Sequence, residues 1–296
     1  MPPGRPFAAA AWMSGSIAGF MALAVAGRQI GLAAEPLDTF EMMFYRSALG
    51  LAGVVAGAAL LGRLDEIGTQ RLPVHAARNL IHFAGQNLWL FALGLIPLAQ
   101  LFALEFSSPL LVALAAPWLL GERLSGARAA ALVLGFAGIL IVARPFGAAG
   151  VSPGLLAALA SALCFAMTAI VTKRLTRVTP VVSILFWLTL MQTGLGLAFA
   201  GWDGSVRLPG PGLIPWVLML GASGIAAHVG LTMALSLAPA TVVTPIDFLR
   251  LPLIAIVGAL AYAEPLDPWV FLGGALIFAA NWVNISAEGR HRTASS

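Results

Sequence analysis

The chain has 296 residues, of which 60% are hydrophobic and only 9% are charged, with a net charge of +4. Soluble domains carry about 25% charged residues, so this composition excludes a soluble protein and indicates a polytopic membrane protein. The basic residues fall in short loops between apolar runs, which is no nucleic-acid signal. Cys164 is the sole cysteine, so an internal disulfide is also excluded.

Ten apolar runs of about 20 residues are each long enough to cross a hydrocarbon core ~30 Å thick. In chain order they centre on residues 8–30, 38–62, 74–95, 98–120, 127–144, 153–173, 180–201, 212–237, 240–263 and 267–286. The first run exceeds the roughly 7–15 apolar residues of a signal peptide, so we expect an uncleaved helix. We predict an all-α integral membrane protein with ten transmembrane helices and a polar tail at 289–296.

Lys and Arg residues are distributed unevenly between the two sides, which predicts a cytoplasmic N-terminus and C-terminus. With the N-terminus inside, the inner side holds Arg5, Arg63, Arg71, Arg78, Arg123, Arg128, Lys173, Arg174, Arg177, Arg290 and Arg292. The outer side then holds only Arg28, Arg144 and Arg207. Arg46 and Arg250 lie within spans, and Arg46, near the outer end of its span, could extend its side chain toward the outer interface.

A weak internal repeat appears when residues 89–124 are aligned with residues 231–266. Nine of the 36 aligned positions are identical, and Glu105 aligns with Asp247. Because each half has five spans, the second half must enter the membrane with the opposite orientation. We therefore predict a 5+5 inverted-topology repeat with halves at 1–146 and 147–288, which in secondary transporters frames a site near the bilayer midplane.

The two halves share a motif at the end of their fourth spans. The first copy reads LEFSSPLLVALAAPWLLGERLSGARAAALVLGFAGILIVARP, and the second reads DFLRLPLIAIVGALAYAEPLDPWVFLGGALI. Because of these motifs and the ten-span layout, the chain resembles the EamA-type branch of the drug/metabolite transporter superfamily over nearly its whole length. The resemblance implies small-molecule transport across the bacterial inner membrane, often export of amino acids, as in exporters of the YddG type.

His82, Gln86 and Trp89 lie at positions i, i+4 and i+7, which is one stripe of a helix. They could offer hydrogen bonds and a stacking wall to a substrate, or they could join helices as polar contacts. His228 aligns with Gln86 in the repeat. Tyr45 aligns with Trp187, so we rank this aromatic pair above the other interfacial aromatics as candidate site residues.

Glu105 has no basic residue within one helical turn. Left unpaired it would stay protonated, because burial disfavours the charged form, and a titratable carboxyl in mid-membrane is what proton coupling needs. The alternative is a buried ion pair with Arg46 or Arg250. Asp247 and Arg250 at i, i+3 favour an internal ion pair, although Arg250 could instead receive a substrate carboxylate.

Spans four and nine contain helix-breaking residues at Ser107–Pro109 and at Pro245 and Pro252. Broken helices at matched positions of two halves point to a binding site, whereas a packing kink is the plainer interpretation. No GxxxxGK[ST] loop is present, so we expect no ATP site, and no other cofactor or metal either.

The function predicted from the sequence is a secondary transporter working by alternating access. It would move a small polar metabolite, with an amino acid and export favoured, as a monomer or homodimer in the lipid bilayer and with protons as a candidate coupling ion. Three alternatives stay open: export of a nucleoside-like or cationic compound, a lipid-modifying membrane enzyme, and an assembly or sensor protein that transports nothing.

Overall fold

The computed structural model describes residues 6–120, 126–145, 150–238 and 240–294, and this part of the chain contains helices and no strands. The helices are α1 (Pro6–Gly31), α2 (Thr39–Leu60), α3 (Leu72–Leu93), α4 (Leu98–Glu105), α5 (Ser108–Leu120), α6 (Gly126–Ala143), α7 (Pro153–Leu175), α8 (Val181–Ala200), α9 (Ile214–Leu237), α10 (Ala240–Asp247), α11 (Arg250–Tyr262) and α12 (Pro268–Ala294). A short 3-10 helix, η1 (Leu64–Glu66), lies between α2 and α3.

These helices make ten crossings, because α4 continues into α5 and α10 into α11 as broken spans. Within the described residues, nine stretches are long and apolar enough to cross a membrane. The tenth crossing is α3, whose polar residues, Arg78 and His82 among them, lower its mean hydropathy. The ten-span prediction is confirmed.

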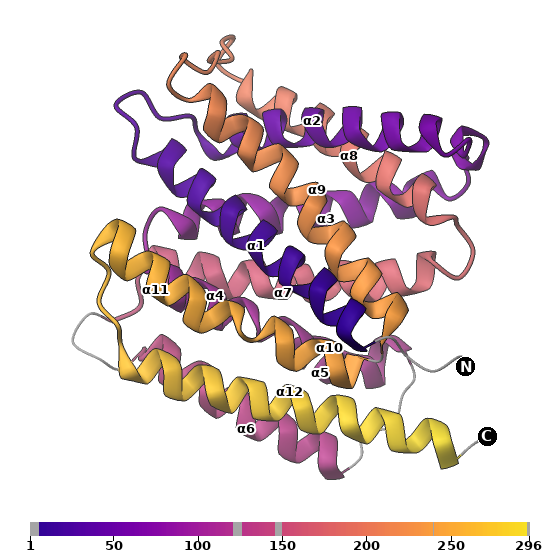
Figure 1. Cartoon of the computed structure of the whole chain (residues 1–296), viewed down its shortest axis with the longest axis vertical. Helices are drawn as coiled ribbons and strands as arrows, with labels where there is room; N and C mark the ends of the chain where they lie inside the picture. The colour runs from indigo at the N-terminus through magenta and orange to yellow at the C-terminus, as the bar shows by residue number, and fades with distance from the viewer. Residues whose placement is uncertain (1–5, 121–125, 146–149, 239, 295–296) are drawn as a thin grey trace.

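The internal repeat is visible in the helix boundaries. The starts of α2/α8, α3/α9, α4/α10, α5/α11 and α6/α12 are all separated by the same offset, the one that aligns Glu105 with Asp247. In Figure 1, α1 and α7 run in opposite directions, and the two termini lie at the same side of the molecule. The 5+5 inverted repeat is therefore confirmed. Which side faces the cytoplasm stays a prediction from the basic residues, of which Arg5 and Arg123 lie outside the described residues.

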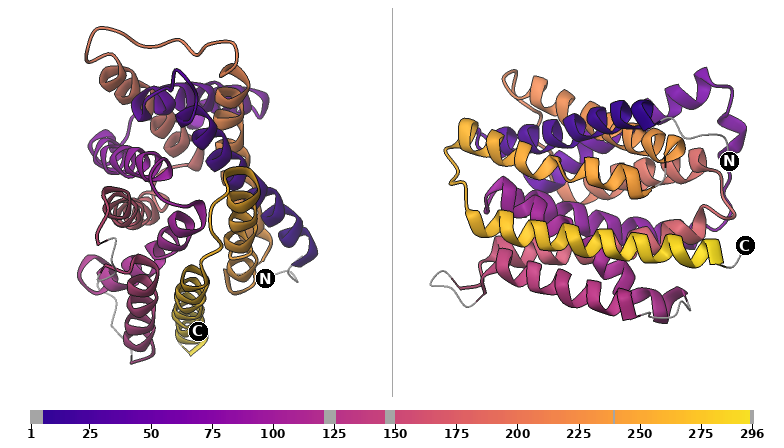
Figure 2. Two further views of the ribbon diagram at one scale, coloured as in Figure 1. Left: turned by 90° about the vertical axis from the view of Figure 1, so that its left-hand side faces the viewer. Right: turned by 60° about the horizontal axis from the view of Figure 1, so that its bottom comes forward.

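Helix packing follows the same two-fold relation. α1 packs along α9 and α3 packs along α7, and exchanging the two halves converts one pair into the other. α2 packs on α8 and α6 packs on α12, so each of these pairs maps onto itself. The pseudo-two-fold axis therefore passes through both pairs, which lie at opposite ends of the long axis of the molecule (Figure 1 and Figure 2).

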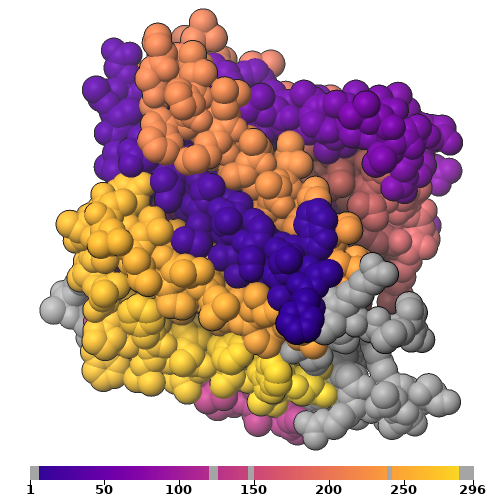
Figure 3. Space-filling view, viewed as in Figure 1, coloured from indigo at the N-terminus to yellow at the C-terminus, as the bar shows by residue number. Residues whose placement is uncertain are grey.

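Small residues allow the closest helix contacts, as is usual where lipid gives no hydrophobic drive for association. α1 lies across one face of the molecule against α9 and α11 (Figure 3). A Cβ at Gly19 of α1 would lie 2.8 Å from the backbone nitrogen of Ala227 in α9. Ser16 donates a hydrogen bond of 2.8 Å to the carbonyl of the same residue. Gly138 and Gly273 likewise allow α6 and α12 to pack closely, because a Cβ at either glycine would lie within 2.7 Å of the carbonyl oxygen of the other.

Candidate functional site

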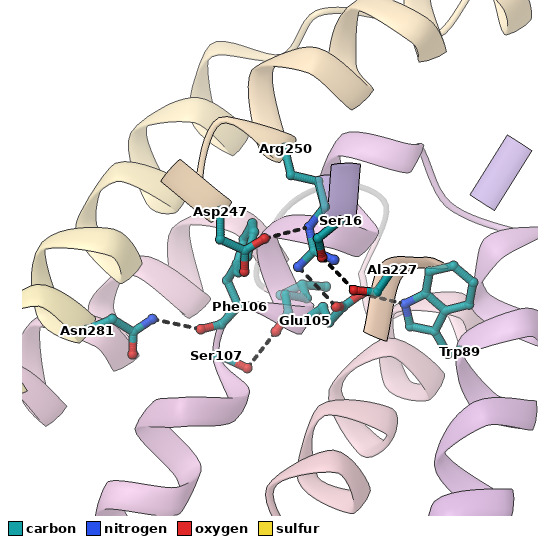
Figure 4. Close-up of polar contacts among 10 residues, drawn as sticks. Ser16, Trp89, Glu105, Phe106, Ser107, Ala227, Asp247, Arg250 and Asn281 are labelled. Atoms are coloured by element: carbon teal, nitrogen blue, oxygen red, sulfur yellow. Dashed lines mark hydrogen bonds and ion pairs between the residues drawn. The ribbon is translucent and has the colours of Figure 1, made fainter. Parts of the chain in front are cut away.

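The two broken spans meet at the middle of the molecule. One break falls at Phe106 and Ser107, and the other falls at the repeat-related residues Phe248 and Leu249. The rings of Phe106 and Phe248 stack with their centroids 4.1 Å apart. A break frees backbone carbonyls, and Asn281 of α12 donates a 2.9 Å hydrogen bond to the carbonyl of Phe106 (Figure 4). The first break thus falls at the predicted Ser107, whereas the second falls between Pro245 of α10 and Pro252 of α11.

A cluster of charged side chains sits at these breaks, as Figure 4 shows. Glu105 ends α4, Asp247 ends α10 and Arg250 begins α11. The Arg250 Nη2 atom lies 3.3 Å from Glu105 Oε1, and its Nε atom lies 3.6 Å from Asp247 Oδ1. The indole nitrogen of Trp89 donates a 2.8 Å hydrogen bond to Glu105 Oε2. Of the two interpretations of Glu105, the structure therefore supports the buried pair with Arg250.

Arg250 is also enclosed by aromatic rings and is only 3% exposed. Its guanidinium carbon lies 4.5 Å from the ring centroid of Phe20, 4.7 Å from that of Phe106 and 5.1 Å from that of Phe102. Such cation–π contacts stabilise a desolvated guanidinium. The residue that aligns with Arg250 in the first half is Ser108, so two repeat-related carboxylates share a single arginine.

A cavity of about 250 Å³ lies between α2, α3, α8 and α9. Its apolar walls come from Leu, Val, Ile and Met side chains, and its polar lining consists of Arg46, Ser47, His82, Thr189, Gln192, His228 and Thr232. The lining extends from the middle of α2 and α9 to the first residue of α8, so the cavity lies toward the side that carries both termini. His82 and His228, both predicted from the sequence, line it together.

Polar contacts join the two halves at the opposite end of the molecule. Arg28 of α1 lies 3.0 Å from Glu264, which follows α11, and also donates a 2.7 Å hydrogen bond to the carbonyl of Ile96. The other carboxylate oxygen of Glu264 accepts a 2.7 Å hydrogen bond from the backbone nitrogen of Leu98, the first residue of α4. One carboxylate thus joins both halves and caps a half-helix.

Arg46 lines the cavity, so it adopts neither of the two arrangements that the sequence left open for it, extension toward the interface or an ion pair with Glu105. Gly224 of α9 makes the space, because a Cβ there would lie 3.2 Å from Arg46 Nε. Arg78, which we expected in a solvated inner loop, is 6% exposed within α3. Its Nε donates a 2.6 Å hydrogen bond to the hydroxyl of Thr172, and its Nη1 bonds to the side chain of Asn79.

The remaining predicted residues lie outside the cavity lining. Gln86 is partly buried on α3. The Tyr45 hydroxyl donates a 2.6 Å hydrogen bond to the carbonyl of Arg207, and the Trp187 indole donates one of 2.7 Å to the carbonyl of Gly68. These two bonds are related by the repeat, and each ties the second helix of one half to a loop of the other.

Sequence reasoning did not single out Thr189 and Gln192. They stand at i, i+3 on α8, and both line the cavity. Gln192 donates a 2.9 Å hydrogen bond to the carbonyl of Asn79, whereas its side-chain oxygen has no partner within the described chain. A short polar stripe on an otherwise apolar membrane helix was the signal that could have found them.

Comparison with known proteins agrees with this architecture. The model of the EamA-like transporter family matches residues 10–144 and again residues 152–286. The chain is 32% identical over 209 residues to a riboflavin transporter of Rhizobium johnstonii, covering 70% of this chain and 68% of the relative. It is 26% identical over 254 residues to an S-adenosylmethionine uptake transporter of Rickettsia bellii, covering 85% of each. It is also 28% identical over 255 residues to the pseudopaline exporter CntI of Pseudomonas aeruginosa, covering 84% of this chain and 86% of the relative.

Proposed function

The chain belongs to the EamA-like transporter family, and on that premise we propose that it carries its substrate through the cavity between α2, α3, α8 and α9 by alternating access. It is a multi-pass membrane protein and a transporter of a small metabolite, not an enzyme. The observation that carries the proposal is a cavity with a partly polar lining toward one side of the membrane, together with the contacts of Arg28 and Glu264 that join the two halves at the other end. We place the protein in a bacterial inner membrane.

The substrate we propose is an amino acid or a related polar metabolite, moved outward. A cavity of about 250 Å³ lies just below the roughly 300–1,000 Å³ of typical ligand pockets, which suits a small metabolite. Hydroxyl, amide and imidazole groups are available to orient it. A flavin is a second candidate, because the relative from Rhizobium johnstonii is named a riboflavin transporter. The relatives include both an uptake transporter and an exporter, so direction must be measured.

In this proposal His82 and His228 contact the substrate, and the cluster of Trp89, Glu105, Asp247 and Arg250 couples transport to protons. Two carboxylates share one guanidinium, so one proton makes the cluster neutral. A neutral cluster is easier to move through an apolar interior than a charged one. The breaks beside it would let the half-helices rearrange when the proton arrives or leaves.

Transport by purified protein in proteoliposomes tests the proposal. Labelled amino acids and riboflavin are offered from each side, with and without a proton gradient. We expect Glu105→Gln and Arg250→Ala to abolish flux. Glu105→Gln should still purify folded, so that its loss of flux cannot be attributed to unfolding, whereas Arg250→Ala should also lose stability. Glu35→Gln, an exposed acid in the loop before α2, is the matched control and should transport normally. Unchanged flux in both cluster variants would remove the cluster from the mechanism, and flux of no compound would count against transport of these classes.

A further inference from the structure

We infer that the cavity binds its substrate through an anionic group, a carboxylate or a phosphate, held by Arg46. This inference rests on the proposed function, since it assigns a substrate class to the same cavity. It goes further because it excludes cations and places the recognition on one side chain. The charges in and around the cavity carry the argument.

Arg46 is the only charged residue among the described residues that line the cavity. Within the described chain, its hydrogen-bond contact is a weak one of 3.9 Å to the sulfur of Met43, and its Nε atom is buried with no partner. A partly buried guanidinium without a counter-charge is unfavourable, and proteins normally pair such a group with an acid. Here the guanidinium instead faces the open space of the cavity.

Arg78 adds a second positive charge close by. It forms no ion pair with any acid in the described part of the chain, and two of its donors are occupied by Thr172 and Asn79. Arg78 lies one helical turn before His82 on α3, and Arg46 lines the cavity together with His82. Arg250 differs from both, because the two carboxylates of Glu105 and Asp247 more than offset its charge. The uncompensated positive charge is therefore concentrated at the cavity.

The rest of the polar lining is neutral and can bind the remainder of a substrate. The Oε1 atom of Gln192 and the Nδ1 atom of His82 are buried without partners among the described residues, and both can meet substrate donors or acceptors. An ammonium or sulfonium group would find no acid among the described lining residues. A guanidinium, in contrast, binds a carboxylate or a phosphate with two parallel hydrogen bonds. The cavity therefore favours an anion over a zwitterion, and a zwitterion over a cation.

A ligand-binding measurement on the purified protein in detergent tests the assignment. Binding is measured as the shift of the thermal unfolding temperature over a titration of each ligand. The probes are matched pairs that differ by one anionic group and carry no other charge: N-acetylalanine against N-acetylalanine amide, and flavin mononucleotide against riboflavin, with inorganic phosphate alone as a fifth probe. The first pair reports a carboxylate and the second a phosphate. We expect the anionic member of at least one pair to bind wild type at least tenfold more tightly than its neutral partner.

Arg46→Gln should lose this preference, and Arg46→Lys should keep part of it, because a lysine retains the charge without the fork of donors. Arg63→Gln is the control, since that side chain is 48% exposed and pairs with Glu66 outside the cavity. Equal binding of charged and neutral partners, an unchanged preference in Arg46→Gln, or no binding of any anion would each overturn the inference. Flux of neutral or cationic compounds alone would overturn it and leave the proposed function standing. Anion binding without flux of any probe would instead count against the proposed function.

Discussion

Replacing Arg250 by glutamine is expected to be the most destabilising single change in the central cluster. The change leaves Glu105 and Asp247 in a protein interior without the cation that now lies 3.3 Å and 3.6 Å from them. Removing one member of a buried ion pair costs about 3–5 kcal/mol, because the remaining charge stays desolvated. The lost contacts with three phenylalanine rings act in the same direction, each by about 0.5–2 kcal/mol at most, and these values are not additive.

The measurement is the free energy of unfolding in mixed micelles of a mild detergent and sodium dodecyl sulfate, followed by circular dichroism. The triple variant Glu105→Gln, Asp247→Asn, Arg250→Gln removes all three charges and should recover most of the loss. Arg144→Gln serves as the control, because its ion pair with Asp267 is 46% exposed on the arginine side and such pairs contribute about 0–1 kcal/mol. If Arg250→Gln unfolds within about 1 kcal/mol of wild type, or if the triple variant is no more stable than it, the cluster is not a buried charge network.

Three further predictions follow from the packing, the closed end and the orientation. Gly19→Ala should destabilise the protein by roughly 1–3 kcal/mol, as overpacking does, because its Cβ would lie 2.8 Å from the backbone of α9. Gly15→Ala is the control on the same helix, since its Cβ would meet nothing within 4 Å, and it should be neutral in the same unfolding assay. Glu264→Gln should lower the free energy of unfolding by roughly 1.5–3 kcal/mol, because it weakens both the charged hydrogen bond from the first N–H of α4 and the ion pair with Arg28. Glu35→Gln is the control and should leave the free energy of unfolding unchanged. A fluorescent protein fused to the C-terminus should fluoresce in intact bacteria and a periplasmic phosphatase fused there should be inactive; the reverse result would contradict the orientation inferred from the basic residues.

The repeat, the breaks and the charged positions were predictable because each leaves a local trace in the chain. Ser107, Ser108 and Pro109 lie at or directly after one break, and Pro245 and Pro252 flank the other, because proline removes a helical hydrogen bond. An acid in an apolar run is equally visible. Aligning Glu105 with Asp247 then brings the two sets into register, and the helix starts repeat at that same offset. The features that depend on a single stretch of the chain, namely the helix breaks and the charged residues within apolar spans, could thus be predicted from the sequence.

The environment of Arg46 could not be predicted, because it depends on a different helix. Gly224 lies in the other half of the chain, and only the packing of α2 beside α9 turns its missing side chain into space for a guanidinium. Tyr45 and Trp187 illustrate the same limit. Their pairing in the repeat was visible, yet their hydrogen bonds reach loops whose position depends on the whole fold. The site residues themselves stay predictions until they are tested by mutation.

The presence of Arg250 opposite Ser108 has an energetic consequence for the transport cycle. With identical halves, the inward-open and outward-open forms would be interchanged by the two-fold axis and equally populated without substrate. A guanidinium supplied by one copy alone removes that degeneracy. A difference of ~1.4 kcal/mol between the two forms already changes their ratio tenfold. Without substrate, the carrier is therefore expected to be predominantly in one of the two forms, with its cavity open to one side of the membrane.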